Sequence, residues 1–381
     1  MHYPASKLPH IGTTIFTVMS QMANEYKAIN LSQGFPDFDG PSALLNAVGA
    51  YIAKGMNQYA PMSGLPVLRE QIAAKVQRIY GNPVSADEVT VTSGATEALF
   101  AAIAAVVRPG DEVIMFDPAY DSYDPAVELN GGRSIHLQLQ PPQFAIDWAQ
   151  VKAAITPKTR LIILNSPHNP TGSVLTAADM QQLIELVRGT DILLLGDEVY
   201  EHIAFDGQQH QSLNRYPELY ERSFVVSSFG KTYHATGWKI GYCVAPPPLT
   251  AEFRKMHQYL TFATCTPMQL ALADILRDEP EHADHLPQFY QQKRDLFCSL
   301  ISNSRFKFTP SAGTYFQVVD YSALSDLPDT AFCEWLTKEV GVAAIPVSVF
   351  CKVPPNMRLI RFCFAKGDET LQRAAERLCA I

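Results

Sequence analysis

Short apolar runs alternate with longer amphipathic stretches between residues 90 and 245, and this alternation constrains the fold more than any other feature of the sequence. Runs such as 161–164 and 192–195 are apolar at every position, as expected for strands covered by helices on both faces. Such alternation is typical of α/β proteins with a mostly parallel sheet. The pattern predicts strands at 89–92, 112–116, 160–165, 191–196, 224–228 and 240–245.

The pattern changes beyond about residue 280. A charged helical stretch at 288–301 is followed by TYFQVVDY and later by RLIRFCFA, which is an α+β pattern. Because domains usually contain ~100 to 200 residues, a chain of 381 residues is expected to form more than one. We expect an N-terminal arm and part of a small domain at 1–40, a large domain at 41–280 and the C-terminal small domain at 281–381.

Composition limits the partners and the compartment. A formal net charge of -8 argues against nucleic acid, because phosphate backbones are bound by basic faces. The sequence contains neither a signal-peptide pattern nor an apolar stretch of the ~20 residues that span a bilayer. The seven cysteines are scattered and form no CxxC pair, which indicates neither a disulfide framework nor a zinc site. We therefore expect a cytoplasmic protein that binds neither nucleic acid nor membrane.

Several familiar motifs are absent. Gly230, Lys231 and Thr232 look like the end of a P-loop, but Val225 occupies the position of its earlier glycine. The sequence has no GxGxxG dinucleotide motif and no GxSxG elbow. Glu198 and His202 have a helical i, i+4 spacing, yet no third ligand is evident, so no metal is predicted.

Polar residues placed at the ends of apolar runs are the informative ones, because ligands of open parallel sheets bind beyond the carboxyl ends of the strands. Four segments have this placement: VTSGATEAL at 91–99, NSPHNPTG at 165–172, DEVY at 197–200 and SSFGKTYHATGWKIGY at 227–242.

Together these segments resemble the class I and II aminotransferases of the aspartate aminotransferase fold, and the similarity extends from LSQGFPDF at 31–38 to MRLIRFCFA at 357–365. Within that family, QGFPDF, NQYAPMSGLPVLRE, KTYHATGWKIG and IRFCFAK are most similar to the kynurenine, glutamine and methionine aminotransferase branch. The resemblance implies a fold type I pyridoxal-phosphate enzyme. Such an enzyme has a large three-layer domain with a mostly parallel sheet and a smaller α+β domain.

Lys231 follows the apolar run 224–226, and the resemblance makes it the residue that binds pyridoxal 5'-phosphate covalently. A cationic neighbour, Lys239, is expected to lower the pKa of its amine, which makes the amine nucleophilic and able to carry a proton. Asp197 ends another run, where a carboxylate can pair with the pyridine nitrogen and keep it protonated. The alternatives are a surface lysine and a helix N-cap.

Three further residues are implied to contact the cofactor ring. By resemblance, Tyr200 and Asn169 donate hydrogen bonds to the phenolic oxygen, which gives Tyr200 a catalytic role as well, and Tyr120 stacks on the ring. The alternatives are a turn-forming residue beside Pro170 for Asn169 and a core aromatic for Tyr120.

The phosphate needs hydrogen-bond donors and positive charge. A helix that begins near Gly94 would direct the backbone N–H groups of Ala95 and Thr96 at an anion. By resemblance, Ser228 and Lys239 complete the phosphate pocket. The alternative is an ordinary helix start.

Arg361 lies on an apolar strand, where an unpaired guanidinium would be costly, so a carboxylate partner is expected. The resemblance makes this partner the α-carboxylate of the substrate, beside Asn169 and the backbone of Gly34, with Phe16 at the border of the side-chain pocket. A structural salt bridge is the alternative. Tyr59 corresponds to a tyrosine that reaches the phosphate of the partner subunit, which predicts a homodimer with shared active sites.

The expected activity is transfer of the amino group of a neutral amino acid, such as methionine, glutamine or an aromatic one, to a 2-oxo acid. A β-lyase that acts on cysteine conjugates is the alternative within the same cofactor class, and the residues named above do not separate the two. A non-catalytic regulator is disfavoured, because the chain carries no basic arm and keeps every core position. His234 and Tyr242 depart from close relatives, which leaves the side-chain preference open.

Overall fold

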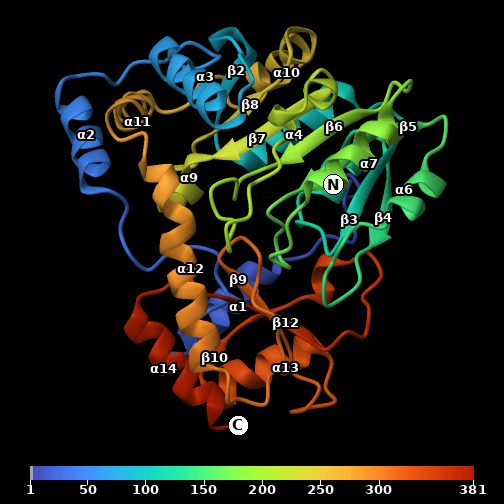
Figure 1. Ribbon diagram of the computed structural model, residues 1–381, viewed down its shortest axis with the longest axis vertical. Coiled ribbons are helices and arrows are strands. Elements are labelled where there is room, and N and C mark those ends of the chain that lie inside the picture. The colour runs from blue at the N-terminus through green and yellow to red at the C-terminus, as the bar shows by residue number, and fades with distance from the viewer. Residues whose placement is uncertain (1–2) are drawn as a thin grey trace.

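The computed structural model describes residues 3–381, and its larger part is a seven-stranded sheet covered by helices on both faces (Figure 1). The strand order is β2-β8-β7-β6-β5-β3-β4, and only β8 runs antiparallel to its neighbours within this sheet. The bounds are β2 Val89–Thr92, β3 Glu112–Asp117, β4 Arg133–Gln138, β5 Thr159–Asn165, β6 Leu193–Asp197, β7 Ser223–Ser228 and β8 Gly241–Val244.

Successive side chains of the buried strands point to opposite faces of the sheet, and each face has its own core. Val113 and Met115 of β3 pack on one face, and Ile114 and Phe116 pack on the other. The first face is covered by α4 Ala95–Val106, α5 Tyr123–Leu129 and α10 Pro247–Leu260. The second is covered by α6 Trp148–Ala154, α7 Ala177–Val187 and α8 Pro217–Tyr220, and beside β2 and β8 by α2 Ser42–Ala53, α3 Pro66–Tyr80 and α11 Thr266–Asp278.

The smaller part, at the bottom of Figure 1, is built on a three-stranded antiparallel sheet with the order β11-β12-β9. A parallel pair joins β1 to β10, which connects the N-terminal segment to the C-terminal one. The elements are α1 Ile15–Glu25, β1 Ile29–Asn30, α12 His282–Leu300, β9 Phe316–Asp320, α13 Asp329–Trp335, β10 Val342–Ala343, β11 Ile345–Pro346, β12 Leu359–Cys363 and α14 Asp368–Cys379.

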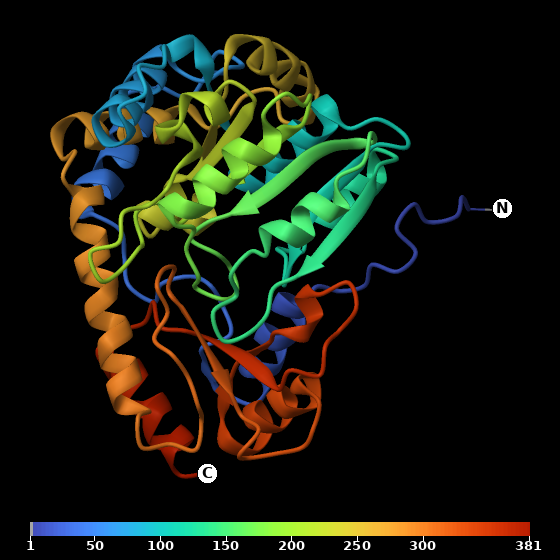
Figure 2. The ribbon, with the colours of Figure 1, turned by 45° about the vertical axis from the view of Figure 1, so that its right-hand side comes forward.

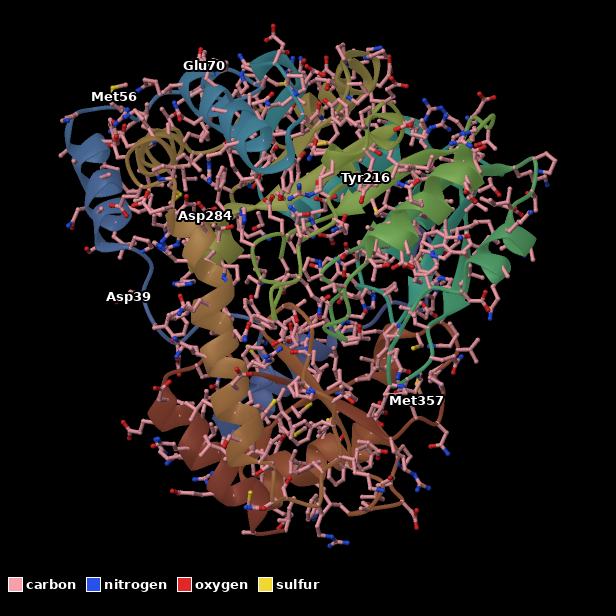
Figure 3. All side chains as sticks on the ribbon, in the orientation of Figure 1. Asp39, Met56, Glu70, Tyr216, Asp284 and Met357 are labelled. Carbon is pink, nitrogen blue, oxygen red and sulfur yellow. The ribbon has the colours of Figure 1, made fainter. Side chains whose placement is uncertain are left out.

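The long helix α12 extends along one side of the molecule from the larger part to the smaller part (Figure 2). Figure 3 shows that side chains fill the space between helices and strands, with Asp284 near the upper end of α12 and Asp39 on the connection that leads up to α2. The predicted strands are all present, and their ends differ from the predicted ones by at most two residues. β4 was not predicted, because this edge strand alternates polar and apolar residues instead of forming a continuous apolar run. The division of the chain at residues 40 and 280 stays a prediction.

The pairing of neighbouring strands brings the strand ends that carry the sequence motifs side by side. Asn165 pairs with Asp197, and Ser228 pairs with Gly241. Because β8 runs against the other strands, its first residue lies at the edge where the parallel strands end. The segment before β8, which contains Lys239, therefore reaches the same edge as Asp197 and Lys231.

We expect Gly241→Ala to lower the free energy of unfolding by ~1–3 kcal/mol, because overpacking forces the backbone apart. A Cβ at this position would lie 2.6 Å from the Ser227 oxygen and 2.9 Å from the Ala95 nitrogen. Urea unfolding followed by circular dichroism measures the change. Gly49→Ala in α2 is the matched control, because a Cβ there has no neighbour within 4 Å and alanine favours helices. A Gly241→Ala protein as stable as the wild type would show that this edge is not tightly packed.

Candidate active site

A cavity of about 170 Å³ lies at the carboxyl edge of the large sheet. The last residues of β5, β6 and β7 line it, together with residues of the segments that follow β2, β3, β5, β6 and β7. Nine of the predicted cofactor-binding residues line this cavity: Ala95, Thr96, Tyr120, Asn169, Asp197, Tyr200, Ser228, Lys231 and Lys239. Tyr59 does not, because it is 86% exposed and packs only the edge of its ring against Phe262.

Lys231 lies in the short helix α9 (Phe229–Thr232), directly after β7. Gly230 lets this turn approach the next segment closely, because a Cβ there would lie 2.9 Å from the Cα of Thr236. Desolvation lowers the pKa of the Lys231 amine to about 8, with smaller contributions from Arg361 and Lys239. The prediction that Lys239 lowers this pKa therefore names a minor cause, and burial is the major one.

The amine of Lys231 donates two hydrogen bonds to neutral oxygens. Its Nζ lies 3.0 Å from the carbonyl oxygen of Gly34 and 2.8 Å from the hydroxyl of Tyr315. Gly34 is one of the predicted substrate-binding residues, whereas Tyr315 was not singled out from the sequence. A Cβ on Gly34 would lie 2.8 Å from the Phe316 ring, so the close approach of this segment depends on glycine.

Asp197 is the last residue of β6 and is 4% exposed. Burial raises the pKa of its carboxyl group to about 6, although the Tyr123 hydroxyl donates to its Oδ2 at 2.5 Å. Asn165, its register partner on β5, donates to the Asp197 carbonyl at 2.8 Å. The same Asn165 side chain accepts from the backbone N–H of Asn169 at 2.8 Å and so fixes the NPTG turn.

Arg361 is completely buried on β12, and burial lowers the pKa of its guanidinium to about 10. It donates to the side-chain oxygen of Asn169 at 2.7 Å and to the carbonyl of Ser32 at 3.0 Å. Its Nε has no partner, and no carboxylate forms an ion pair with Arg361 within residues 3–381. The predicted structural salt bridge, which was the alternative interpretation, is thus not present in the described chain. A buried cation with only neutral partners is suited to an incoming carboxylate.

Aromatic rings surround the guanidinium of Arg361. Its central carbon lies 3.8 Å from the ring centre of Phe316, 5.6 Å from that of Phe16 and 5.8 Å from that of Phe350. Phe16 and Phe350 also pack against each other, with ring centres 5.7 Å apart. The structure thus places Phe16 beside Arg361, on the apolar side of the site.

The start of α4 lines the cavity and offers a place where an anion can bind. Gly94 precedes the helix with a φ of 78° and provides no side-chain cap to the first turn. The backbone N–H groups of Ala95 and Thr96 belong to the first turn, where helices attract negative charge. A Cβ on Gly94 would lie 3.4 Å from the Nζ of Lys239, so the cation is held beside these groups. The hydroxyl of Thr96 lies 3.3 Å from that of Tyr120.

Within residues 3–381 no group of three or more His, Cys, Asp or Glu side chains is placed to hold a metal ion. Glu198 instead contacts His210 at 2.9 Å and the backbone N–H of Leu213 at 2.9 Å. No helix in the same range is long and apolar enough to cross a membrane.

Comparison with known proteins agrees with this geometry. The family model "Aminotransferase class I and II" matches residues 26–378. Methionine aminotransferase of Escherichia coli is 58% identical over 98% of this chain and 97% of its own length. Kynurenine–oxoglutarate transaminase 1 of the mouse is 33% identical over 99% of this chain and 97% of its own. A crystal structure from Escherichia coli, assigned a methionine aminotransferase function, superposes with a TM-score of 0.98, covering 100% of both chains at 57% identity.

The fold and this arrangement of strand-end residues define an enzyme with an aspartate aminotransferase-like fold. The chain belongs to the class I and II aminotransferase family, whose members depend on pyridoxal phosphate. The predicted fold class and family are therefore confirmed, whereas the roles of the individual residues remain predictions.

Three contacts in the site were missed by sequence reasoning. Tyr315 touches Lys231, Tyr123 touches Asp197, and Asn165 holds the turn that carries Asn169. Asn165 had a signal, because it ends an apolar run inside a segment already singled out. For the two tyrosines, nothing in the sequence distinguishes them from core aromatics.

The lowered pKa of Lys231 predicts a pH-dependent stability. Between pH 8 and 10.5 the unfolded chain binds the proton that the folded chain has released, so the wild type gains stability as pH rises through this window. Without added ligand, Lys231→Met should gain up to ~1–3 kcal/mol over the wild type at neutral pH from removal of a desolvated charge. This advantage should shrink toward pH 10.5. Chemical unfolding at several pH values measures it, and a stability difference that does not vary with pH would contradict the lowered pKa.

Proposed function

We propose that this chain binds pyridoxal 5'-phosphate at Lys231 and transfers the amino group of a neutral amino acid, with methionine as the preferred donor, to a 2-oxo acid. One observation carries the proposal. A lysine whose amine has a lowered pKa lies in the same cavity as a buried carboxylate, Asp197, and an anion-binding helix start at Ala95.

The donor set fits this cofactor. The N–H groups at the start of α4, with Lys239 and Ser228, suit a phosphate, because they combine positive charge with hydrogen-bond donors. Asp197 suits a protonated pyridine nitrogen, since a cation beside it would compensate the burial that raises its pKa. When bound, pyridoxal phosphate supplies an aldehyde that links to an amine and a ring that withdraws electrons from the linked amino acid.

Lys231 acts as nucleophile and as proton carrier. An amine with a pKa of about 8 is partly neutral near neutral pH, so its nitrogen can attack a carbonyl carbon. Once the amino group of the substrate has displaced Lys231 from that carbon, the freed Nζ takes up the proton that leaves the Cα of the substrate. Tyr200 is 3% exposed, and its ring centre lies 5.4 Å from this Nζ, so its phenol lines the cavity beside the amine.

Arg361 binds the α-carboxylate of the substrate in this proposal. Its unpartnered Nε and the absence of a paired carboxylate in the described chain support this role. The rings of Phe16, Phe316 and Phe350 make the surroundings apolar, which favours a hydrophobic side chain such as that of methionine. The methionine aminotransferase of Escherichia coli, at 58% identity, supports the same donor.

A β-lyase acting on cysteine conjugates is less well supported. None of the relatives reported above is named as a lyase, and every residue discussed serves both reactions equally. Pyruvate and ammonia formed from a cysteine conjugate, compared with 2-oxo acid formed from methionine, distinguish the two activities.

The proposal includes a homodimer and a cytoplasmic location. The large side chains of Tyr59, Tyr259, Leu260 and Phe262 are exposed, and the ring centres of Tyr59 and Phe262 lie 5.5 Å apart, which supports a surface that a second copy of the chain covers. The seven cysteines are all free, and five of them are buried, which suits a reducing compartment.

A panel of amino acids mixed with the purified holoenzyme tests the proposed function directly. We expect the visible absorbance band of the cofactor to shift fastest with methionine and slowly with aspartate.

Lys231→Ala should lose more than ~1000-fold in turnover, because it lacks both the covalent link and the proton carrier. Borohydride reduction followed by mass spectrometry locates the linkage. Protein that takes up no pyridoxal phosphate, or that carries it elsewhere than Lys231, would exclude the assignment.

Tyr59→Phe tests the shared active site. If the Tyr59 hydroxyl binds phosphate across a dimer, its loss should weaken cofactor binding about 10-fold, the usual cost of one charge-assisted hydrogen bond. Equilibrium dialysis of the cofactor measures the change. Tyr259→Phe is the matched control, since Tyr259 is 84% exposed and lies three residues before Phe262, whose ring packs against Tyr59. Equal cofactor affinity in both variants would argue that Tyr59 takes no part in the site.

A further inference from the structure

Tyr315 meets the amine of Lys231 at a three-way junction of hydrogen bonds. Its hydroxyl lies 2.8 Å from Lys231 Nζ and 2.5 Å from the carbonyl oxygen of Gly34, which itself lies 3.0 Å from the same Nζ. A carbonyl oxygen can only accept, so the single proton of Tyr315 goes to Gly34. The hydroxyl oxygen of Tyr315 therefore accepts a hydrogen bond from Lys231.

This geometry determines the direction of the lone pair of Lys231. A neutral amine has two N–H groups and one lone pair. Because Gly34 and Tyr315 are both acceptors, they engage both N–H groups. The lone pair is then left pointing away from them, and Lys231 lines the cavity on its remaining side. An amine oriented in this way is ready to attack or to take up a proton in the cavity.

Tyr315 is held firmly enough to impose this orientation. Its side chain is completely buried, and its ring packs against those of Tyr200 and Phe316, with centres 5.1 and 4.9 Å away. Its backbone oxygen accepts from the N–H of Phe364 at 2.9 Å. Burial raises the pKa of the Tyr315 hydroxyl well above 10, so it keeps the proton that it gives to Gly34.

We propose that Tyr315 is a positioning residue that orients the Lys231 amine for attack and for proton transfer. The inference rests on the proposed function and adds a residue outside the predicted set. The simpler interpretation is that Tyr315 only fills the core with its ring. The two interpretations differ in the hydroxyl alone, and Tyr315→Phe removes it while the ring remains.

The chain provides a matched control for this substitution. Tyr290 is also completely buried, and its ring centre lies 5.5 Å from that of Tyr315. Its hydroxyl has no hydrogen-bond partner among residues 3–381. Tyr290→Phe therefore deletes a hydroxyl from the same core without touching Lys231, and it should behave as the wild type.

The first measurement uses the holoenzyme. In single turnovers with methionine, Tyr315→Phe should slow the absorbance change about 10-fold, the effect of one misplaced hydrogen bond on a barrier. The concentration of methionine for half-maximal rate should stay within about twofold, because Arg361 is unchanged. Methionine deuterated at Cα should show a larger isotope effect in Tyr315→Phe than in the wild type, since proton transfer becomes more limiting.

The second measurement does not use turnover. Full-length protein stripped of cofactor is mixed with pyridoxal phosphate at a series of pH values, and the rate of coupling to Lys231 is followed by absorbance. The hydroxyl of Tyr315 accepts from the amine and so stabilises its charged form, which means that its loss should move the pH midpoint of coupling downward. The maximal rate should fall in parallel with the single-turnover rate.

The outcomes separate the two levels of the proposal. If the wild type neither couples to pyridoxal phosphate nor reacts with methionine, the proposed function fails. If the wild type does both and Tyr315→Phe matches Tyr290→Phe in rate, isotope effect and pH midpoint, the positioning role of Tyr315 is overturned. Equal losses in both variants would also overturn it, because general disturbance of the core would then explain the result.

Discussion

The candidate active site depends on two cations, Lys231 and Arg361, that the fold removes from water without giving them a carboxylate partner in the described chain. Desolvation lowers both pKa values, and the bonds these groups make go to neutral oxygens of Gly34, Tyr315, Asn169 and Ser32. Burial of unpaired charge is unfavourable, so the remaining structure must enforce it. In the proposed function, burial leaves part of the Lys231 amine neutral, so its lone pair can attack a carbonyl carbon, and it leaves Arg361 as an unpaired cation that can bind a carboxylate.

Three features of the chain hold these cations in place. The parallel strands bring Asp197, Asn165 and the segment of Lys231 to one edge, and the reversed strand β8 brings Lys239 to the same edge. The smaller antiparallel sheet supplies Arg361 from β12. The pairing of β1 with β10 fixes the N-terminal segment, whose carbonyl groups at Ser32 and Gly34 then reach both cations. No one of these elements forms the site alone.

The sequence predicted those parts of the site that depend on strand ends. Asp197, Asn169 and Lys231 follow or end apolar runs, so the expectation that they meet at one edge required only the parallel topology. The contacts that were missed join segments far apart in the chain, as in the bond from Tyr315 to Gly34 across 281 positions. Such contacts depend on tertiary packing, and a buried tyrosine that directly precedes a core strand, as Tyr315 precedes β9, has no local signature. Tyr59 remains a prediction because its proposed role needs a second chain.

Backbone carbonyl groups orient the two buried cations, and of these groups the sequence analysis named Gly34 but not Ser32. Arg361 has five N–H donors, and its contacts with Asn169 and Ser32 use the two terminal nitrogens, while Nε is unpartnered within residues 3–381. A carboxylate can therefore bind without breaking the bonds that orient the guanidinium. Since Gly34 lies two residues after Ser32, the same segment fixes the amine of Lys231. The spacing between the Arg361 guanidinium and the Lys231 amine is thus set by one short stretch of backbone, and in the proposed function the aromatic rings around Arg361 favour an apolar substrate side chain.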